Sequence, residues 1–108
     1  FPTANVVASD TFKLIPKNGV YTVTFGVNGE KYYGMMNIGN RPTVSMSNEV
    51  YLEINIFDFD RDIYGSNVRV GFLSRIREEK KFASLNELVQ QLHKDKEYCI
   101  NFLNKINI

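Results

Sequence analysis

Apolar and polar residues alternate along several stretches of the chain, and a period of two is typical of β-strands with one buried face. The clearest alternation covers residues 20–27. Further extended stretches cover 31–38, 49–57 and 67–72, and we expect the last one to continue toward Ile76. The pattern therefore predicts a sheet of several short strands.

The pair Asn28-Gly29 separates the first two of these stretches. It favours a two-residue hairpin, because a type I′ turn needs a positive φ at both central positions. Residues 37–43 are rich in Asn, Gly and Pro, and we expect them to break the sheet before a polar loop at 44–48. The first two strands are thus predicted to form an antiparallel hairpin.

The last quarter of the chain changes to a helical period. Ser84 and Glu87 have the spacing of a capping box, which is a signature of a helix N-terminus. The apolar residues that follow at near-helical spacing are Leu85, Leu88, Val89, Leu92, Cys99, Phe102, Leu103 and Ile106. One amphipathic helix over 85–105 is predicted. Short antiparallel strands followed by a helix indicate a mainly β domain, a small β-barrel or sandwich with a helical lid.

The strand predicted at 49–57 carries one carboxylate in its middle. Its aliphatic residues should face the core, and they are Val50, Leu52, Ile54 and Ile56. Glu53 lies on the opposite face between aromatic and amide neighbours. A mid-strand carboxylate is held rigidly, which suits a catalytic group, but the same pattern also fits a polar residue on a solvated sheet face.

Composition excludes several classes of protein. The 108 residues suit a single domain, and the net charge of +1 predicts neither a nucleic-acid surface nor a membrane surface. Cys99 is the one cysteine, and its apolar surroundings predict a buried small hydrophobic residue. With no apolar stretch of transmembrane length and no signal peptide, we expect a cytoplasmic protein. Because the first residue is Phe1, we expect it to be a segment of a longer chain.

Few residues have the spacing of a known catalytic or metal site. There is no glycine-rich loop of the P-loop or Rossmann type and no Cys/His spacing for zinc, and His93 fits a solvated helix face. Thr3 and Asn5 are two apart, so in an extended segment their oxygens point to the same side. These neutral oxygen ligands suit Mg²⁺ if a nucleotide supplies negative charge, and a polar edge segment is the alternative.

Four motifs occur in one order along nearly the whole chain. They are Phe-Pro-Thr-Ala-Asn at 1–5, Asn-Ile-Gly-Asn-Arg-Pro-Thr at 37–43, Leu-Glu-Ile at 52–54 with Asp-Ile-Tyr-Gly at 62–65, and Ile-Arg-Glu-Glu-Lys-Lys-Phe at 76–82 with Ser-Leu-Asn-Glu-Leu at 84–88. This set resembles the riboflavin kinases (flavokinases), especially the C-terminal module of bacterial bifunctional riboflavin kinase/FMN adenylyltransferases. The resemblance implies a six-stranded Greek-key β-barrel that transfers the γ-phosphoryl group of ATP to the 5′-hydroxyl of riboflavin and forms FMN.

The resemblance also implies roles for single residues. Thr3 and Asn5 would hold the Mg²⁺ that bridges the ATP phosphates, and Glu53 would be the catalytic base. The nucleotide would contact Tyr64, and the flavin would contact Arg77, Lys80 and Phe82. Two of these flavin contacts have another interpretation: Arg77 could pair with Glu78, Glu79 or Asp62 on the surface, and Phe82 could pack as a hydrophobic staple against the helix start.

The resemblance finally implies a boundary and partners. Riboflavin kinases carry a further strand and a glycine-containing loop just before the first motif, and these cover the ATP phosphates. We therefore expect residues 1–108 to be an N-terminally truncated riboflavin kinase domain, inactive alone, with an FMN adenylyltransferase domain preceding it in the parent chain. The alternative is a non-catalytic small-barrel module that binds nucleic acid or another protein.

Overall fold

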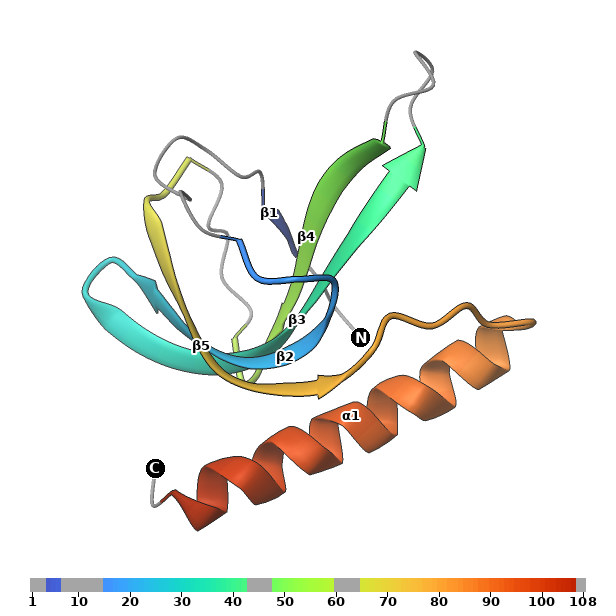
Figure 1. Ribbon diagram of the computed structural model, residues 1–108. Helices are drawn as coiled ribbons and strands as arrows, with labels where there is room; N and C mark the ends of the chain where they lie inside the picture. The colour runs from blue at the N-terminus through green and yellow to red at the C-terminus, as the bar shows by residue number, and fades with distance from the viewer. Residues whose placement is uncertain (1–3, 7–14, 43–47, 60–64, 107–108) are drawn as a thin grey trace.

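The computed structural model describes residues 4–6, 15–42, 48–59 and 65–106, which form one antiparallel sheet and one long helix (Figure 1). The elements in chain order are β1 (Ala4–Val6), β2 (Gly19–Val27), β3 (Glu30–Pro42), β4 (Asn48–Ile56), β5 (Val68–Arg77) and α1 (Leu85–Lys105). The prediction of a mainly β domain that ends in a helix is confirmed.

The strand order in the sheet is β1-β4-β3-β2-β5, and every neighbouring pair is antiparallel. β2, β3 and β4 lie side by side in sequence order, and β5 returns to lie beside β2. This is the connectivity of a Greek key. Among the described residues β1 and β5 are the two edges of the sheet and do not pair with each other, so a closed six-stranded barrel stays a prediction.

The hairpin between β2 and β3 has the predicted turn. Asn28 has a φ of 52° and Gly29 a φ of 78°, so both central positions lie in the left-handed region that a type I′ turn requires. The two strands pair from Val27 and Glu30 at the turn to Gly19 and Ile38 at the far end. Local sequence therefore determines both the position and the type of this turn.

The predicted break at 37–43 is wrong for residues 37–42, because β3 continues through them to Pro42. Residues beyond Ile38 have lost β2 as a neighbour, and they pair with β4 alone. Proline is tolerated at the end of a strand that has a neighbour on one side only. It has no N–H to donate, but few hydrogen bonds to a neighbouring strand are lost at such a position. Pairing with β4 thus overrides the low strand propensity of this stretch.

Gly39 of β3 lies beneath a contact between two side chains, those of Tyr51 and Glu79. A Cβ atom at this position would lie 2.7 Å from the ring and hydroxyl of Tyr51 and would collide with the carboxylate of Glu79. Those two side chains meet over the glycine, where the Tyr51 hydroxyl donates a hydrogen bond of 2.8 Å to Oε1 of Glu79. A larger residue at this position would therefore have to displace the Tyr51 and Glu79 side chains from this contact.

One face of the sheet carries the main core, in which the strands contribute Tyr21, Val23, Phe25, Val27, Met36, Ile38, Leu52 and Ile54. Leu52 and Ile54 confirm the predicted core face of β4, and Ile56 packs against the same cluster. Val50 does not, because it lies near the end of the strand and is 47 % exposed.

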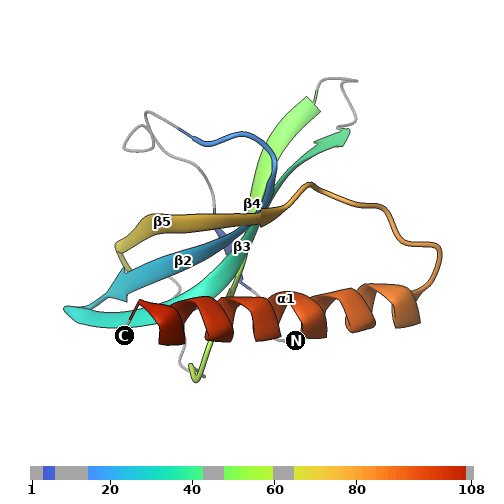
Figure 2. The same ribbon diagram turned by 60° about the horizontal axis from the view of Figure 1, so that its bottom comes forward.

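The other face of the sheet is covered by α1, which crosses below β2, β3 and β5 (Figure 2). From the sheet, Val20, Thr22 and Met35 are buried here, and from the helix Cys99 and Leu103 are buried. The sheet face that carries Glu53 is therefore packed against α1. The position of the helix determines how much of this face is exposed to solvent. No helix in the described ranges is long and apolar enough to cross a membrane.

The helix bounds agree with the prediction. Oγ of Ser84 accepts a hydrogen bond of 3.2 Å from the backbone N–H of Glu87, as expected for the N-cap. The Glu87 carboxylate accepts from the backbone N–H of Ala83 at 3.0 Å, so the reciprocal bond of the capping box reaches one residue further back than expected.

Cys99 is completely buried, as predicted, and lies 3.3 Å from the hydroxyl of Thr22 in the sheet. Burial raises the pKa of the Cys99 thiol from its ordinary value of 9.0 to about 11, and the contact with Thr22 offsets part of this shift. The thiolate is the reactive form of cysteine, so this thiol is held in its inert form.

We expect Cys99 to resist a disulfide reagent at a pH of about 8 and to react fully after denaturation. Between pH 9.0 and about 11 the unfolded chain ionises first, so stability should fall as the pH rises through this window. Thiol titration checks the first expectation, and thermal melts of wild type and Cys99→Ala check the second. Rapid reaction of the native protein would contradict the burial of this side chain.

Candidate active site

The register of the sheet aligns one residue from each strand in a single row. From edge to edge, the row consists of Asn5, Glu53, Asn37, Val20 and Arg77. Residues that lie directly opposite each other in antiparallel strands share a face of the sheet, with Cβ atoms about 5 Å apart. The row therefore brings together positions from all four sequence motifs.

Two irregularities in the pairing of β2 with β5 determine which arginine joins this row. Between Val20 and Val23, the pairing passes over Leu73 and Ile76 of β5. Each bulge shifts the register, and together they place Arg77 opposite Val20. Bulges often re-aim side chains next to functional sites.

A cavity of about 100 Å³ lies over the row, between the sheet and the first half of α1. Its polar lining consists of Asn37, Glu53, Asn55, Arg77 and Lys80. Its apolar lining consists of Val20, Met35, Phe82, Leu88 and Leu92. An apolar wall with a few convergent polar groups is typical of small-molecule sites. The structure thus gathers Glu53, Arg77, Lys80 and Phe82 of the predicted site around one space.

Glu53 lies in the middle of β4 and is half-buried. Neighbouring strands pair with it on both sides, through Asn5 of β1 and Asn37 of β3. The alternative interpretation, a residue on a freely solvated face, does not fit this position, because Glu53 lines the cavity below α1. Its carboxylate is held by a rigid strand and remains partly accessible.

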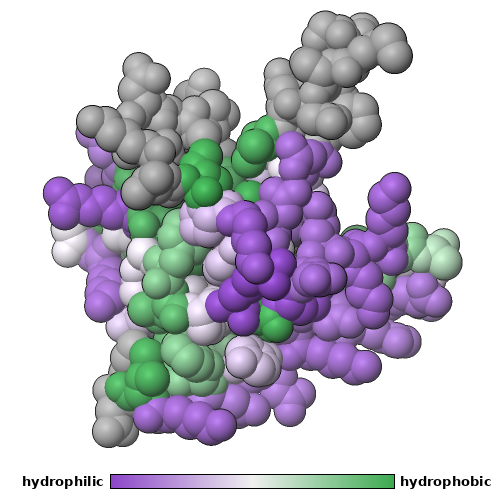
Figure 3. Space-filling view, viewed as in Figure 1, coloured by the Kyte–Doolittle hydropathy of each residue, from purple (hydrophilic) through white to green (hydrophobic). Residues whose placement is uncertain are grey.

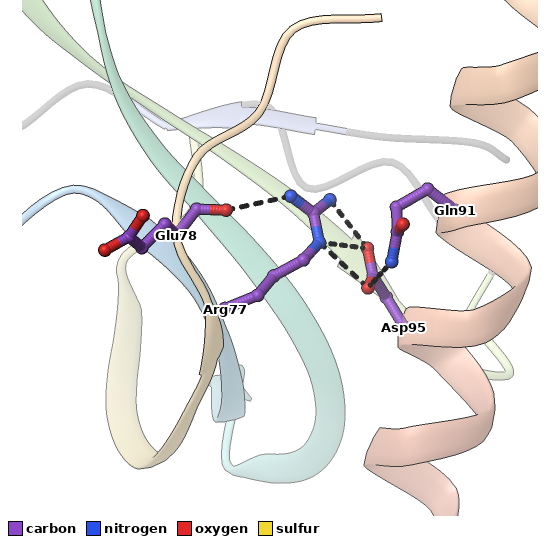
Figure 4. Close-up of polar contacts among 4 residues, drawn as sticks. All are labelled: Arg77, Glu78, Gln91 and Asp95. Carbon is purple, nitrogen blue, oxygen red and sulfur yellow. Dashed lines mark hydrogen bonds and ion pairs between the residues drawn. The ribbon is translucent and has the colours of Figure 1, made fainter.

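Arg77 is bound to the helix through a carboxylate that the sequence analysis did not single out. Figure 4 shows its guanidinium between Asp95 of α1 and the backbone oxygen of Glu78. Nε donates to the two Asp95 oxygens at 3.0 and 3.2 Å, and Nη2 donates to Oδ2 at 2.8 Å. Nη1 donates to the Glu78 carbonyl at 3.0 Å, and Gln91 donates to Oδ1 of Asp95 at 3.0 Å.

The carboxylate of Asp95 is 2 % exposed and the Arg77 side chain 18 % exposed, so this ion pair is largely withdrawn from water. The alternative interpretation of Arg77, a surface ion pair with Glu78, Glu79 or Asp62, did not include this partner, and Asp62 lies outside the described residues. One signal in the sequence could have revealed it: Asp95 lies in the buried stripe of α1, between Leu92 and Cys99. A carboxylate in such a stripe needs a partner.

The connection between β5 and α1, residues 78–84, forms the outer wall of the cavity. Phe82 is half-buried and lines the cavity together with Leu88 of the helix. The cationic groups of Arg77 and Lys80 lie 5.8 and 5.7 Å from the centre of its ring, within the range of cation–π attraction. On the face shown in Figure 3, hydrophilic residues predominate over the middle of α1 and this connection, whereas a strip of hydrophobic residues follows β5.

Thr3 and Tyr64 lie outside the described residues, and of Asn5 only the backbone position is described. The described residues contain no group of three or more His, Cys, Asp or Glu side chains that could hold a metal ion. The register nevertheless puts the amide-bearing Asn5 opposite the carboxylate-bearing Glu53. Hard oxygen donors of this kind fit Mg²⁺ when phosphates complete the site.

A second cavity, of about 480 Å³, lies at the other end of α1. Two ammonium groups lie over aromatic rings at its wall: Lys31 is 5.5 Å from the ring of Tyr33, and Lys96 is 5.4 Å from that of Phe57. None of the site residues predicted from the sequence lines this cavity. It is therefore separate from the site described above.

Comparison with known proteins agrees with the motifs. The family model Flavokinase, described as riboflavin kinase, matches residues 1–103. The chain is 39% identical over 108 residues to the bifunctional riboflavin kinase/FMN adenylyltransferase of Bacillus subtilis strain 168, covering 98% of this chain and 34% of that protein. It is 48% identical over 95 residues to the RNA-binding riboflavin kinase RibR of the same organism, covering 88% of this chain and 40% of that protein.

A crystal structure described as the macrolide-efflux protein from Streptococcus pneumoniae is 43% identical and superposes with a TM-score of 0.85. The match covers 93% of this chain and 32% of that one. The chain spans between about a third and two fifths of the length of the two curated relatives above. The family match over nearly all residues is sufficient: the chain belongs to the riboflavin kinase (flavokinase) family.

Proposed function

We propose that this chain is a riboflavin kinase domain, which transfers the γ-phosphoryl group of ATP to the 5′-hydroxyl of riboflavin and forms FMN. One observation carries the proposal. The carboxylate expected to act as the base, Glu53, lines the same cavity as the residues expected to contact the flavin, although they lie far apart in the sequence. A non-catalytic binding module would not need a carboxylate at the centre of such a cavity.

The lining of the cavity suits the two parts of riboflavin. The apolar wall, which includes Phe82, Leu88 and Leu92, suits the flat isoalloxazine ring, and the polar floor on β3 and β4 suits the ribityl chain. Its volume of about 100 Å³ is below the roughly 300–1,000 Å³ usual for ligand sites. We infer that the connection 78–84 moves outward when the flavin binds, since its residues 78–81 are exposed to solvent.

Glu53 would orient the 5′-hydroxyl and accept its proton as the phosphoryl group is transferred. A primary alcohol does not ionise at neutral pH, so a carboxylate within hydrogen-bond reach assists the reaction. Phosphoryl transfer has a loose transition state with most of the charge on the transferred group. Positioning of the two substrates should therefore contribute more to the rate than the base does.

The remaining roles follow the motif positions. Thr3 and Asn5 would hold Mg²⁺, which neutralises charge on the ATP phosphates when bound, and Tyr64 would contact the nucleotide. Lys80 and Phe82 would contact the flavin from the connection that closes the cavity. Arg77 spends most of its hydrogen-bonding capacity on Asp95 and Glu78, so we infer that it contacts the flavin through its remaining N–H groups.

The names of the relatives suggest two extensions of this proposal. The bifunctional relative is about three times as long as the matched segment, and we propose that this kinase domain also works beside an FMN adenylyltransferase domain in the full-length protein. RNA binding is named for RibR, of which the chain covers 40%. The net charge of +1 gives no electrostatic support for RNA binding by this segment.

The test is FMN formation from riboflavin and ATP by the full-length protein, meaning the chain as encoded from its own start codon. Residues 1–108 alone are assayed beside it, and flavin binding is measured separately through quenching of riboflavin fluorescence. We expect ATP- and Mg²⁺-dependent FMN formation by the full-length protein. Absence of FMN formation by the full-length protein would overturn the proposal, whether or not riboflavin binds.

Replacing Asn5 with leucine tests the metal position. The variant loses a hard oxygen donor opposite Glu53, so we expect the Mg²⁺ and ATP concentrations needed for half-maximal activity to rise by roughly tenfold or more. Riboflavin binding without nucleotide should change little. The measurement is FMN formation over a Mg²⁺ titration, and an unchanged Mg²⁺ dependence would remove Asn5 from the site.

A further inference from the structure

One polar atom in the cavity has no hydrogen-bond partner among the described residues. Oδ1 of Asn37 is buried and has no hydrogen-bond partner in the part of the chain that the structure describes. A buried acceptor without a partner lowers stability, and buried polar side chains usually have one. The two other buried side-chain atoms without partners in that part belong to Ser74 and Arg75, which do not line this cavity.

The position of Asn37 relates it directly to the proposed base. In the sheet it lies between Val20 of β2 and Glu53 of β4, directly opposite each, and all three residues line the cavity. Residues paired in this way carry their Cβ atoms about 5 Å apart on the same face. The unsatisfied acceptor and the carboxylate are therefore neighbours on the polar floor of the cavity.

A comparison with Asn55 shows that an amide in this cavity can be satisfied by the fold. Asn55 lies two residues after Glu53 on β4, is 7 % exposed and lines the same cavity, yet no buried atom of its side chain lacks a hydrogen-bond partner. The difference indicates that the acceptor of Asn37 is available to a ligand. An acceptor recognises a donor, and a neutral polyol supplies donors as hydroxyl groups.

We propose that Oδ1 of Asn37 accepts a hydrogen bond from the 4′-hydroxyl of riboflavin while the 5′-hydroxyl lies at Glu53; this inference rests on the proposed kinase function. The two hydroxyls are on neighbouring carbons, so they can reach two acceptors on directly opposite residues at the same time. The contact fixes the end of the ribityl chain, so that the 5′-oxygen faces the phosphoryl donor. Asn37 is thus a substrate-binding residue that also selects for an intact polyol.

The experiment compares two flavins and two proteins in the full-length chain. Riboflavin and riboflavin lacking the 4′-hydroxyl are titrated by fluorescence and assayed for phosphorylation, with wild type and with Asn37→Leu. For wild type we expect loss of the hydroxyl to lower affinity and kcat/KM by roughly 5- to 100-fold, because a buried acceptor is left unpaired. For Asn37→Leu the two flavins should behave alike.

Thermal stability separates a ligand-binding role from a structural one. Leucine at position 37 replaces a half-buried amide, whose buried Oδ1 has no partner, with an apolar side chain of similar size, so the thermal midpoint of Asn37→Leu should stay unchanged or rise. The control is Asn104→Leu, which makes the same chemical change at the second cavity. That variant should still discriminate between the flavins as wild type does.

The outcomes separate this inference from the proposed function. Equal binding of the two flavins by wild type would overturn the role of Asn37 without any need for a variant. The role of Asn37 would also be overturned if loss of the 4′-hydroxyl lowered affinity and kcat/KM as much in Asn37→Leu as in wild type. If the protein distinguishes the two flavins through Asn37 but forms no FMN, the contact of Asn37 with the 4′-hydroxyl would be supported and the kinase proposal refuted. No binding of riboflavin would refute both.

Discussion

Replacing Asp95 with asparagine is expected to lower the free energy of unfolding by about 3 kcal/mol. The change leaves the Arg77 guanidinium facing a neutral amide in a position that is only 18 % exposed. Removing one member of a buried ion pair typically costs about 3–5 kcal/mol, and the residual exposure of Arg77 places the expected loss at the lower end. Urea denaturation of wild type and variant, compared at equal m-value, measures the difference.

Two further variants test whether the loss comes from the unpaired charge. In the double variant Asp95→Leu with Arg77→Met, both charges are replaced by apolar groups, and much of the stability should return. Glu97→Gln changes a carboxylate on an exposed part of the same helix and should alter stability by less than about 0.5 kcal/mol. If Asp95→Asn lowered the free energy of unfolding as little as Glu97→Gln does, the Arg77–Asp95 ion pair would not hold the helix against the sheet.

Glu53→Gln is expected to lower the kcat of FMN formation by about 10²–10⁴, which corresponds to roughly 3–5 kcal/mol of barrier. Glutamine keeps the size and hydrogen-bonding reach of the side chain but cannot accept a proton at neutral pH. Riboflavin affinity and the thermal midpoint should change little, because Glu53 is partly accessible and the substitution is nearly isosteric. Steady-state kinetics, a fluorescence titration and a melt of the full-length protein provide the three measurements.

These measurements also distinguish the ways in which the Glu53 prediction could fail. A kcat close to that of wild type would mean that Glu53 does not act as the base. A large drop in the thermal midpoint would instead assign it a structural role in β4. Glu97→Gln again serves as the matched control, since it makes the same chemical change on the exposed part of α1 and should leave kcat unaltered.

Local sequence signals predicted those elements whose cause is local. The Asn28-Gly29 turn and the helix after Ser84 depend on the φ preferences and capping bonds of the residues themselves, and both were predicted at the right place. The continuation of β3 to Pro42 was missed, because it depends on pairing with β4 and not on its own composition. Tertiary pairing overrides propensity in such cases.

Only the family motifs allowed the individual residues of the candidate site to be predicted. Spacing along the chain suggested that Glu53 leaves the aliphatic face of its strand, and the cavity agrees with this. The partner of Arg77 was not predictable as a contact, because it requires the packing of α1 against the sheet. The unsatisfied oxygen of Asn37 could not be predicted either, since satisfaction is a property of the whole environment of an atom.

The row that runs from Asn5 to Arg77 across all five strands has a consequence for the tolerance of this domain to insertions and deletions. A one-residue deletion inside β3 or β4 exchanges the two faces of the strand beyond it. It would turn Asn37 or Glu53 toward the main core and bring an aliphatic neighbour to the cavity. A change of length in a connection between strands leaves the row intact. Length variation should therefore be confined to the connections, whereas the strands keep their length even at positions where many side chains would pack equally well.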